Sequence, residues 1–213
     1  MSNDQRTVWL IRHGNRADFA DPAWCDTAPR PHDPPLSPDG VEQATQLGAQ
    51  LANEKIDHLF ASPFLRTVET AAHIADAIRQ PIHIEHGLAE MLLERWFPVE
   101  PDYIAPSELV RLFPYLDAAY ASAVTCRYPE TEEDVWARTA HAMRMLLERY
   151  EGNLMLVAHG GSIWGLARAL LNAEPAIHTG LCCRIRLAQR GDSWTLLEDG
   201  SDSVADGEAI RLM

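Results

Sequence analysis

Lysine is almost missing from this sequence: Lys55 stands alone among 18 Lys plus Arg residues, so nearly every basic side chain is an arginine. Acidic side chains number 31, which gives a formal net charge of −13 at pH 7. A field of that sign repels nucleic-acid backbones and acidic membrane surfaces, so we expect neither as a partner. An acidic protein that binds an anionic substrate must therefore gather a few arginines at one place.

Long apolar runs are missing as well. No stretch of eighteen apolar residues occurs, so no membrane span is expected. Residues 1–5 have neither the basic start nor the apolar stretch of a signal peptide, and we therefore expect a cytoplasmic protein. The chain also lacks repeats, low-complexity stretches and long linkers, which favours a single domain over residues 1–213.

Cysteine is scarce, and no two cysteines form a CxxC motif. The four cysteines are interpreted as reduced thiols of a cytosolic protein. Cys182 and Cys183 fall on an expected strand, where neighbouring side chains point to opposite faces of the sheet. Their spacing therefore predicts no shared metal ion.

What the chain does contain is an alternation of short apolar runs with amphipathic helical patterns. Ser37 and Ser62, each followed by proline, are predicted to cap helices, and Thr131 with Asp134 predicts a capping box. Val41 is expected on the buried face of its helix. This order predicts an α/β fold, a three-layer α/β/α sandwich with a mostly parallel sheet. The expected strands are 8–11, 56–61, 82–84 and 154–158; the helices are 37–51, 62–75, 131–150 and 159–171, with short ones near Leu109 and Leu116; a loop covers 18–35, and a hairpin of 181–187 and 194–197 turns at 191–192.

Two histidines come directly after predicted strands. Arg12 and His13 follow the strand 8–11, and His159 follows the strand 154–158. In α/β sheets of this kind, ligands bind at the carboxyl ends of the strands. Arg12 and Arg16 flank His13, and this repulsion favours the neutral imidazole that a nucleophile requires. The same arginines can bind phosphate oxygens through charge-assisted hydrogen bonds, while Gly14 allows a tight turn.

Two further groups of residues have the same character. Arg66 lies in the first turn of a predicted helix, where an arginine alone is slightly unfavourable against the helix dipole. An anion bound between the helix N-terminus and Arg66 would explain this position. His159, followed by Gly160 and Gly161, can stabilise charge on a phosphoryl group while backbone N–H groups approach it.

Together the three groups resemble the histidine phosphatase superfamily, also called phosphoglycerate mutase-like proteins. The resemblance rests on an RHG motif at 12–14, an SP-x-x-R-x-x-x-T motif at 62–70 and a late HG motif at 159–160. It implies that His13 becomes a phosphohistidine and that Arg12, Arg66 and His159 hold the phosphoryl oxygens, without metal or cofactor. It also implies a carboxylic acid that protonates the leaving group; Glu90 is favoured and Glu94 is the alternative.

Arg16 and Phe19 decide which branch of this family the sequence resembles. Mutases of the family usually carry a small hydroxyl residue and an asparagine at these positions, so hydrolysis is preferred. The pattern is similar to the phosphatase domains of suppressor-of-T-cell-receptor-signalling proteins and ecdysteroid phosphate phosphatases, which implies that Arg16 is a fourth phosphate-binding arginine. Asn15 occupies the position after the RHG motif where glutamate is common in the family, and the sequence assigns no role to it.

The expected substrate is a small-molecule or protein phosphomonoester. A mutase-type phosphoryl transferase and an inactive phosphate-recognition module are the alternatives. The sequence leaves the oligomeric state open, and a homodimer is compatible with it.

Overall fold

A computed structural model describes residues 6–203 of the chain, and its centre is one six-stranded sheet. The strand order is β3-β2-β4-β1-β5-β6, with β1 to β4 parallel, β5 antiparallel to β1 and β6 antiparallel to β5. The predicted α/β class with a mostly parallel sheet is confirmed. The strands are β1 (Thr7–Arg12), β2 (His58–Ala61), β3 (Ile82–Ile84), β4 (Leu154–Ala158), β5 (Arg184–Arg190) and β6 (Ser193–Asp199).

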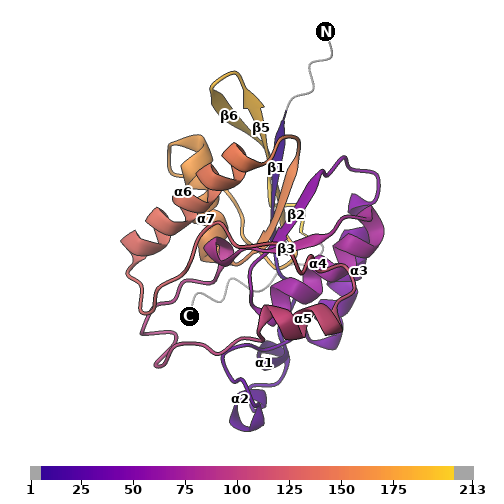
Figure 1. Cartoon of the computed structure of the whole chain (residues 1–213), viewed down its shortest axis with the longest axis vertical. Coiled ribbons are helices and arrows are strands. Elements are labelled where there is room, and N and C mark those ends of the chain that lie inside the picture. The colour runs from indigo at the N-terminus through magenta and orange to yellow at the C-terminus, as the bar shows by residue number, and fades with distance from the viewer. Residues whose placement is uncertain (1–5, 204–213) are drawn as a thin grey trace.

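Helices cover both faces of this sheet, with α3 and α4 on one side and α6 and α7 on the other (Figure 1). No helix within residues 6–203 is both long and apolar enough to cross a membrane. The helices are α1 (Ala17–Ala20), α2 (Trp24–Thr27), α3 (Pro38–Leu51), α4 (Leu65–Ile78), the 3₁₀ turn η1 (His86–Leu88), α5 (Pro106–Leu112), α6 (Glu132–Arg149) and α7 (Gly160–Leu171).

Strand β1 shows why the chain forms two apolar cores. Trp9 and Ile11 point to the face covered by α3 and α4, whereas Val8 and Leu10 point to the face covered by α6 and α7. Successive side chains of a strand alternate between faces, so a strand covered on both sides must be apolar throughout. The continuous run 8–11 in the sequence is therefore the pattern of a central, doubly covered strand.

The predicted caps of α3 and α6 are confirmed. Ser37 Oγ accepts a hydrogen bond from the Gly40 amide at 3.2 Å. Thr131 and Asp134 form both hydrogen bonds of a capping box. The predicted cap of α4 is wrong, because the helix begins at Leu65 and its N-cap residue makes no side-chain hydrogen bond.

Other boundaries also differ from the sequence predictions. Leu116 lies in no helix and instead forms an isolated bridge with Ile82 at the edge of the sheet. Cys182 precedes β5 and has a left-handed backbone with φ of 52°, so the pair of cysteines is not on a strand. Val41 is 40% exposed rather than buried. Two one-turn helices, α1 and α2, occupy the expected loop 18–35.

Leu10 tests the importance of the doubly covered strand. Its side chain is fully buried, so truncation in Leu10→Ala leaves a cavity that neighbouring side chains only partly fill. We expect the free energy of unfolding, measured by urea denaturation, to fall by about 2–5 kcal/mol. Leu197→Ala on β6 is the matched control, because Leu197 is 43% exposed and its loss should cost much less. Equal losses for both variants would contradict this account of the core.

Candidate active site

The two histidines lie side by side because the strands before them are neighbours. Arg12, the last residue of β1, pairs in register with Ala158, the last residue of β4. The next residue on each strand is a histidine, and the His13 amide donates to the Ala158 carbonyl at 3.2 Å. The ring centroids of His13 and His159 are 5.3 Å apart. Both side chains therefore meet at the carboxyl edge of the parallel strands.

His13 is held in one tautomer. The residue is 1% exposed, and Nδ1 lies 2.8 Å from the Gly14 carbonyl oxygen. A carbonyl can only accept, so Nδ1 carries the proton and Nε2 keeps its lone pair. Burial first, and then the charges of Arg66 and Arg12, hold the pKa of His13 well below its ordinary value. The result is a neutral imidazole with a free Nε2.

Arg66 brings a buried positive charge into contact with His159 and Glu90. Its Nη2 lies 3.2 Å from His159 Nδ1 and 3.5 Å from Glu90 Oε2, and its side chain is 1% exposed. Burial, and next the charge of Arg16, lower the pKa of Arg66 to about 10, so it stays protonated at neutral pH. Its Nε and Nη1 are buried without a hydrogen-bond partner, which is the state of donors suited to an anion.

His159 is oriented from both sides of its ring. Its Nδ1 lies 3.2 Å from Arg66 Nη2, and its Nε2 lies 2.8 Å from Ser62 Oγ, a hydroxyl that can donate or accept. Burial, followed by the charges of Arg66 and His13, lowers the pKa of His159 well below its usual value. Ser62 thus orients a histidine. The sequence had predicted that it caps α4 instead.

Glu90 is the carboxylate that reaches this group. Its Oε2 lies 3.3 Å from His159 Nδ1, while its Oε1 accepts from the Met91 amide at 3.0 Å. The side chain is 13% exposed, so one part of it remains open to solvent. Glu94, the alternative acid, is exposed on the loop after it. Of the two candidates, Glu90 is the one in contact with Arg66 and His159.

The remaining two arginines are placed differently from each other. Arg12 Nη1 donates to the Thr179 carbonyl at 2.5 Å, and its Nε is buried without a partner. Arg16 Nε donates to Asp18 Oδ1 at 2.9 Å and its Nη2 pairs with the other carboxylate oxygen, so its guanidinium is already engaged. Arg16 still lies close enough for its charge to lower the pKa values of Arg66 and of both histidines.

Asn15, which received no role from the sequence, connects the loop after β1 to the start of α3. Its Nδ2 donates to Asp39 Oδ2 at 2.7 Å, and its backbone carbonyl accepts from the Ser37 amide at 3.0 Å. Its Oδ1 accepts from the Arg16 amide at 3.0 Å. Asn15 therefore shapes the loop between His13 and Arg16.

Two supporting residues escaped the sequence analysis. Asp33 Oδ1 accepts from the Leu65 amide at 2.7 Å, so a carboxylate 32 residues away caps the helix that carries Arg66. Thr70 Oγ1 donates to the Arg66 carbonyl at 2.7 Å and accepts from the Gly14 amide at 3.1 Å. No local pattern announces the Asp33 contact. Thr70 belongs to the motif at 62–70, which was the available signal.

The same cluster can be compared with a metal site. Single ligand atoms of His13, Glu90 and His159 lie within 4.8 Å of one another. The Arg66 guanidinium, however, contacts both His159 and Glu90, and a fixed positive charge there repels a cation. Among the described residues, this arrangement of donors is better suited to an anion than to a metal ion.

The site combines buried neutral histidines, an arginine with free donors and a carboxylate at the edge of a parallel sheet. This set of groups is suited to binding a phosphoryl group. The model of the histidine phosphatase superfamily (branch 1) matches residues 8–200, and the chain belongs to this family. The sequence-based assignment, including the similarity to ecdysteroid phosphatases, is confirmed.

Several curated proteins are similar to this chain. Ecdysteroid-phosphate phosphatase of Drosophila melanogaster is 28% identical over 91% of this chain and 32% of its own length. A 55 kDa subunit of transcription factor tau from Saccharomyces cerevisiae is 28% identical over 96% of the chain and 48% of its own length. The chain thus spans about a third to a half of the length of these two relatives.

Among solved structures, the ecdysone phosphate phosphatase of Bombyx mori in complex with tungstate superposes with a TM-score of 0.81. It is 24% identical, and the match covers 98% of both chains. A mycobacterial glucosyl-3-phosphoglycerate phosphatase has a TM-score of 0.67 at 23% identity, covering 92% of this chain and 98% of that one. At these identities the likeness establishes the fold.

The lowered pKa of His13 makes stability depend on pH. The unfolded chain binds a proton at His13 near its ordinary pKa of 6.5, whereas the folded chain does not until the pH is much lower. The contribution of His13 to the free energy of unfolding is therefore fully present above about pH 6.5, and it is lost as the pH drops below this value. The slope from this one group is about 1.4 kcal/mol per pH unit.

Urea denaturation between pH 7.5 and 5 measures this slope. In His13→Gln the slope should be smaller than in the wild type by the contribution of one proton. The same slope in both proteins would show that His13 gains its proton normally in the folded state.

Proposed function

We propose that this protein is a phosphomonoester hydrolase that forms a covalent phosphohistidine on His13. The observation that carries the proposal is the free Nε2 of a buried, neutral His13 beside Arg66, whose Nε and Nη1 have no partner. A nucleophile and anion-binding donors thus share one buried place. Membership of the histidine phosphatase superfamily supports the same reading.

In the first half of the proposed reaction, His13 Nε2 attacks phosphorus. The P–N bond forms as the bond from phosphorus to the leaving oxygen breaks, and protonated Glu90 gives its proton to that oxygen. Arg12, Arg66 and His159 stabilise the charge on the phosphoryl oxygens. Arg16 joins them when its guanidinium exchanges Asp18 for a phosphoryl oxygen.

In the second half, water attacks the phosphohistidine. The Glu90 carboxylate accepts a proton from the water, the P–N bond breaks, and inorganic phosphate leaves with neutral His13 restored. The positive charge that this reaction requires comes from the buried arginines, so the proposed mechanism contains no metal ion. The substrate class is a phosphate ester, as the names of the ecdysteroid-phosphate phosphatases indicate for those relatives.

A second candidate function is recognition of a phosphorylated partner without catalysis. The specific observation in its favour is the yeast relative, whose name describes a transcription factor subunit rather than a phosphatase. Phosphoryl transfer between two positions of one substrate, as in a mutase, is the weaker alternative, because Arg16 and Phe19 occupy positions where mutases carry other residues.

Hydrolysis of p-nitrophenyl phosphate in EDTA tests the proposal. We expect wild-type activity to survive chelation and His13→Ala to lose at least about 10³-fold, because the nucleophile is absent. His141→Ala on α6 is a control for the loss of a histidine outside the site. After reaction with a radioactive phosphoester, the wild type should carry a covalently bound label that acid releases. His13→Ala should carry no such label.

The outcomes separate the candidates. Activity that depends on a phosphorylated primer would favour the mutase reading. A folded wild type that hydrolyses no phosphomonoester but still binds phosphate or tungstate would favour the recognition module and overturn the hydrolase.

Arg66 provides a further prediction with a control on the same helix. Arg66→Ala removes the buried guanidinium, and we expect kcat/KM to fall by at least about 10²-fold, since charge on the phosphoryl group is no longer balanced. Arg79→Ala, at the C-terminal end of α4 with a side chain 74% exposed, should leave kcat/KM unchanged. Equal activity of both variants would exclude Arg66 from phosphoryl binding.

A further inference from the structure

The segment that carries Glu90 has no regular secondary structure after η1, yet residues 87–89 and 91–92 are buried. Buried backbone N–H and C=O groups need hydrogen-bond partners, and a segment outside helix and sheet must find them elsewhere. The Ala89 carbonyl accepts from Ser162 Oγ on α7 at 2.5 Å. The amides of residues 87–89 donate to Glu85 and His86. Arg138 and Glu130 bind two further carbonyls and both backbone groups of Leu92.

Arg138, on α6, uses all of its donors on this segment and on Glu130. Its Nη1 donates to the carbonyls of Gly87 and Ala89, each at 3.0 Å, and its Nη2 donates to the carbonyl of Glu90 at 3.0 Å. Its Nε and Nη2 donate to the two oxygens of Glu130 at 2.6 and 2.8 Å. A guanidinium has five N–H groups, and these five contacts satisfy them all.

Glu130 completes the arrangement at the far end of the segment. Its Oε2 accepts from the Leu92 amide at 3.1 Å, and its own amide donates to the Leu92 carbonyl at 2.9 Å. Arg138 and Glu130 have side chains only 5% and 3% exposed. A buried ion pair thus binds three carbonyls before and at Glu90, and both backbone groups two residues after it.

We propose that Arg138 and Glu130 form a positioning pair that aims the Glu90 carboxylate at the leaving group, a role that rests on the proposed phosphatase function. Neither residue touches the Glu90 carboxylate. They fix the backbone on both sides of it, which leaves only the Glu90 side-chain torsions free. The contacts of that carboxylate with Arg66 and His159 then select its direction.

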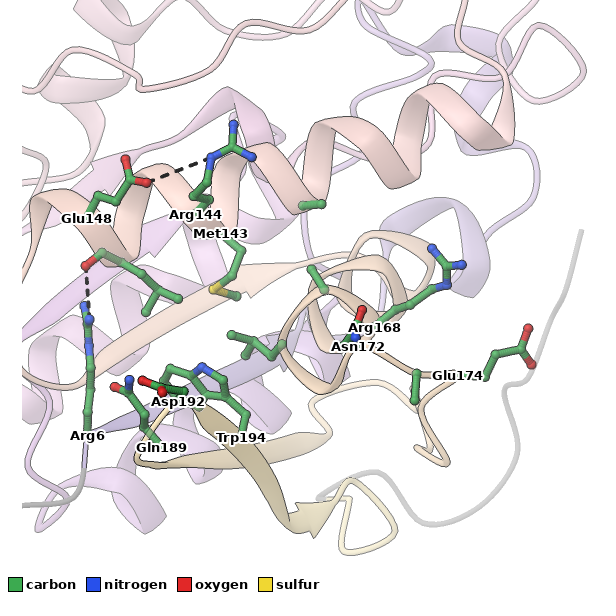
Figure 2. Close-up of a pocket in the computed structure, with 15 residues that line it drawn as sticks. Arg6, Met143, Arg144, Glu148, Arg168, Asn172, Glu174, Gln189, Asp192 and Trp194 are labelled. Atoms are coloured by element: carbon green, nitrogen blue, oxygen red, sulfur yellow. Dashed lines mark hydrogen bonds and ion pairs between the residues drawn. The ribbon is translucent and has the colours of Figure 1, made fainter.

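The chain contains a second arginine that binds backbone carbonyls, and it offers a matched control. Arg6 Nε donates to the Gly152 carbonyl at 2.9 Å and Nη1 to that of Leu147 at 3.0 Å, while Nη2 contacts that of Tyr150. Arg6 borders a cavity of about 970 Å³ between α6, α7 and the β5–β6 hairpin (Figure 2). Arg6 lies directly before β1, and His13 lies directly after it. The length of this extended strand separates the two residues by about 20 Å.

The experiment compares two substrates with unequal need for an acid. Nitrophenolate leaves p-nitrophenyl phosphate as a stable anion, whereas ethyl phosphate must release an alkoxide that requires a proton. In Arg138→Lys the compact ammonium cannot replace five planar donors, so Glu90 loses its fixed position. We expect kcat for ethyl phosphate to fall about 10²-fold and kcat for p-nitrophenyl phosphate to fall far less.

Glu90→Gln, which has no proton to give, sets the reference for this substrate-dependent loss. Arg6→Lys makes the same chemical change far from Glu90 and should leave the ratio of the two kcat values unchanged. Glu130→Gln is a second variant, which keeps the size of the side chain but weakens the ion pair; its ratio should move in the same direction as in Arg138→Lys. Equal falls on both substrates in Arg138→Lys and Glu130→Gln would overturn the positioning role.

Hydrogen exchange provides a readout that needs no activity. Amides of residues 87–92 should exchange faster in Arg138→Lys than in the wild type, and they should not change in Arg6→Lys. If the wild type hydrolyses neither substrate, the proposed function fails and exchange alone decides. Faster exchange confined to this segment would then keep Arg138 as its anchor, whereas unchanged exchange would overturn it.

Discussion

The buried charge of Arg66, which contacts His159 and lowers the pKa of both histidines, is the constraint on which the site depends. Moving a guanidinium away from water is costly unless other groups compensate it. Glu90 compensates part of this charge at 3.5 Å, while His13 and His159 respond by staying neutral, because burial and the adjacent arginines oppose a second positive charge. In the proposed reaction, the same charge that disfavours protonation of His13 leaves its Nε2 able to attack and attracts the anionic substrate.

Such a site requires support from residues that never meet a ligand. The N-terminus of α4 takes its cap from Asp33, and the loop after β1 is held by Thr70. The backbone of the segment with Glu90 is hydrogen-bonded to Arg138 and Glu130. Each contact joins a loop to an element far away in the chain, so the precision of the site comes from the packing of α3, α4, α6 and α7 around one sheet.

Much of this could be predicted where a local pattern decides the outcome. The run 8–11 predicts a doubly covered strand because alternation allows no polar residue there, and serine before proline predicts the cap of α3. The same reasoning was wrong at Ser62. There a second requirement, orientation of His159, takes the hydroxyl that a cap would have used. Leu116 likewise pairs with a strand edge, a contact with no periodicity to reveal it.

By itself, then, the sequence determined the α/β class, the strand ends that carry His13 and His159, and the family. These depend on hydrophobic periodicity and on motifs, which act within a few neighbouring residues. Only the tertiary structure decided that Nδ1 of His13 faces a carbonyl, that Arg16 is held by Asp18, that Glu90 rather than Glu94 meets Arg66, and that Arg138 anchors the segment between them. Hydrogen bonds are short and directional, so partners distant in sequence are chosen only once the whole chain has packed.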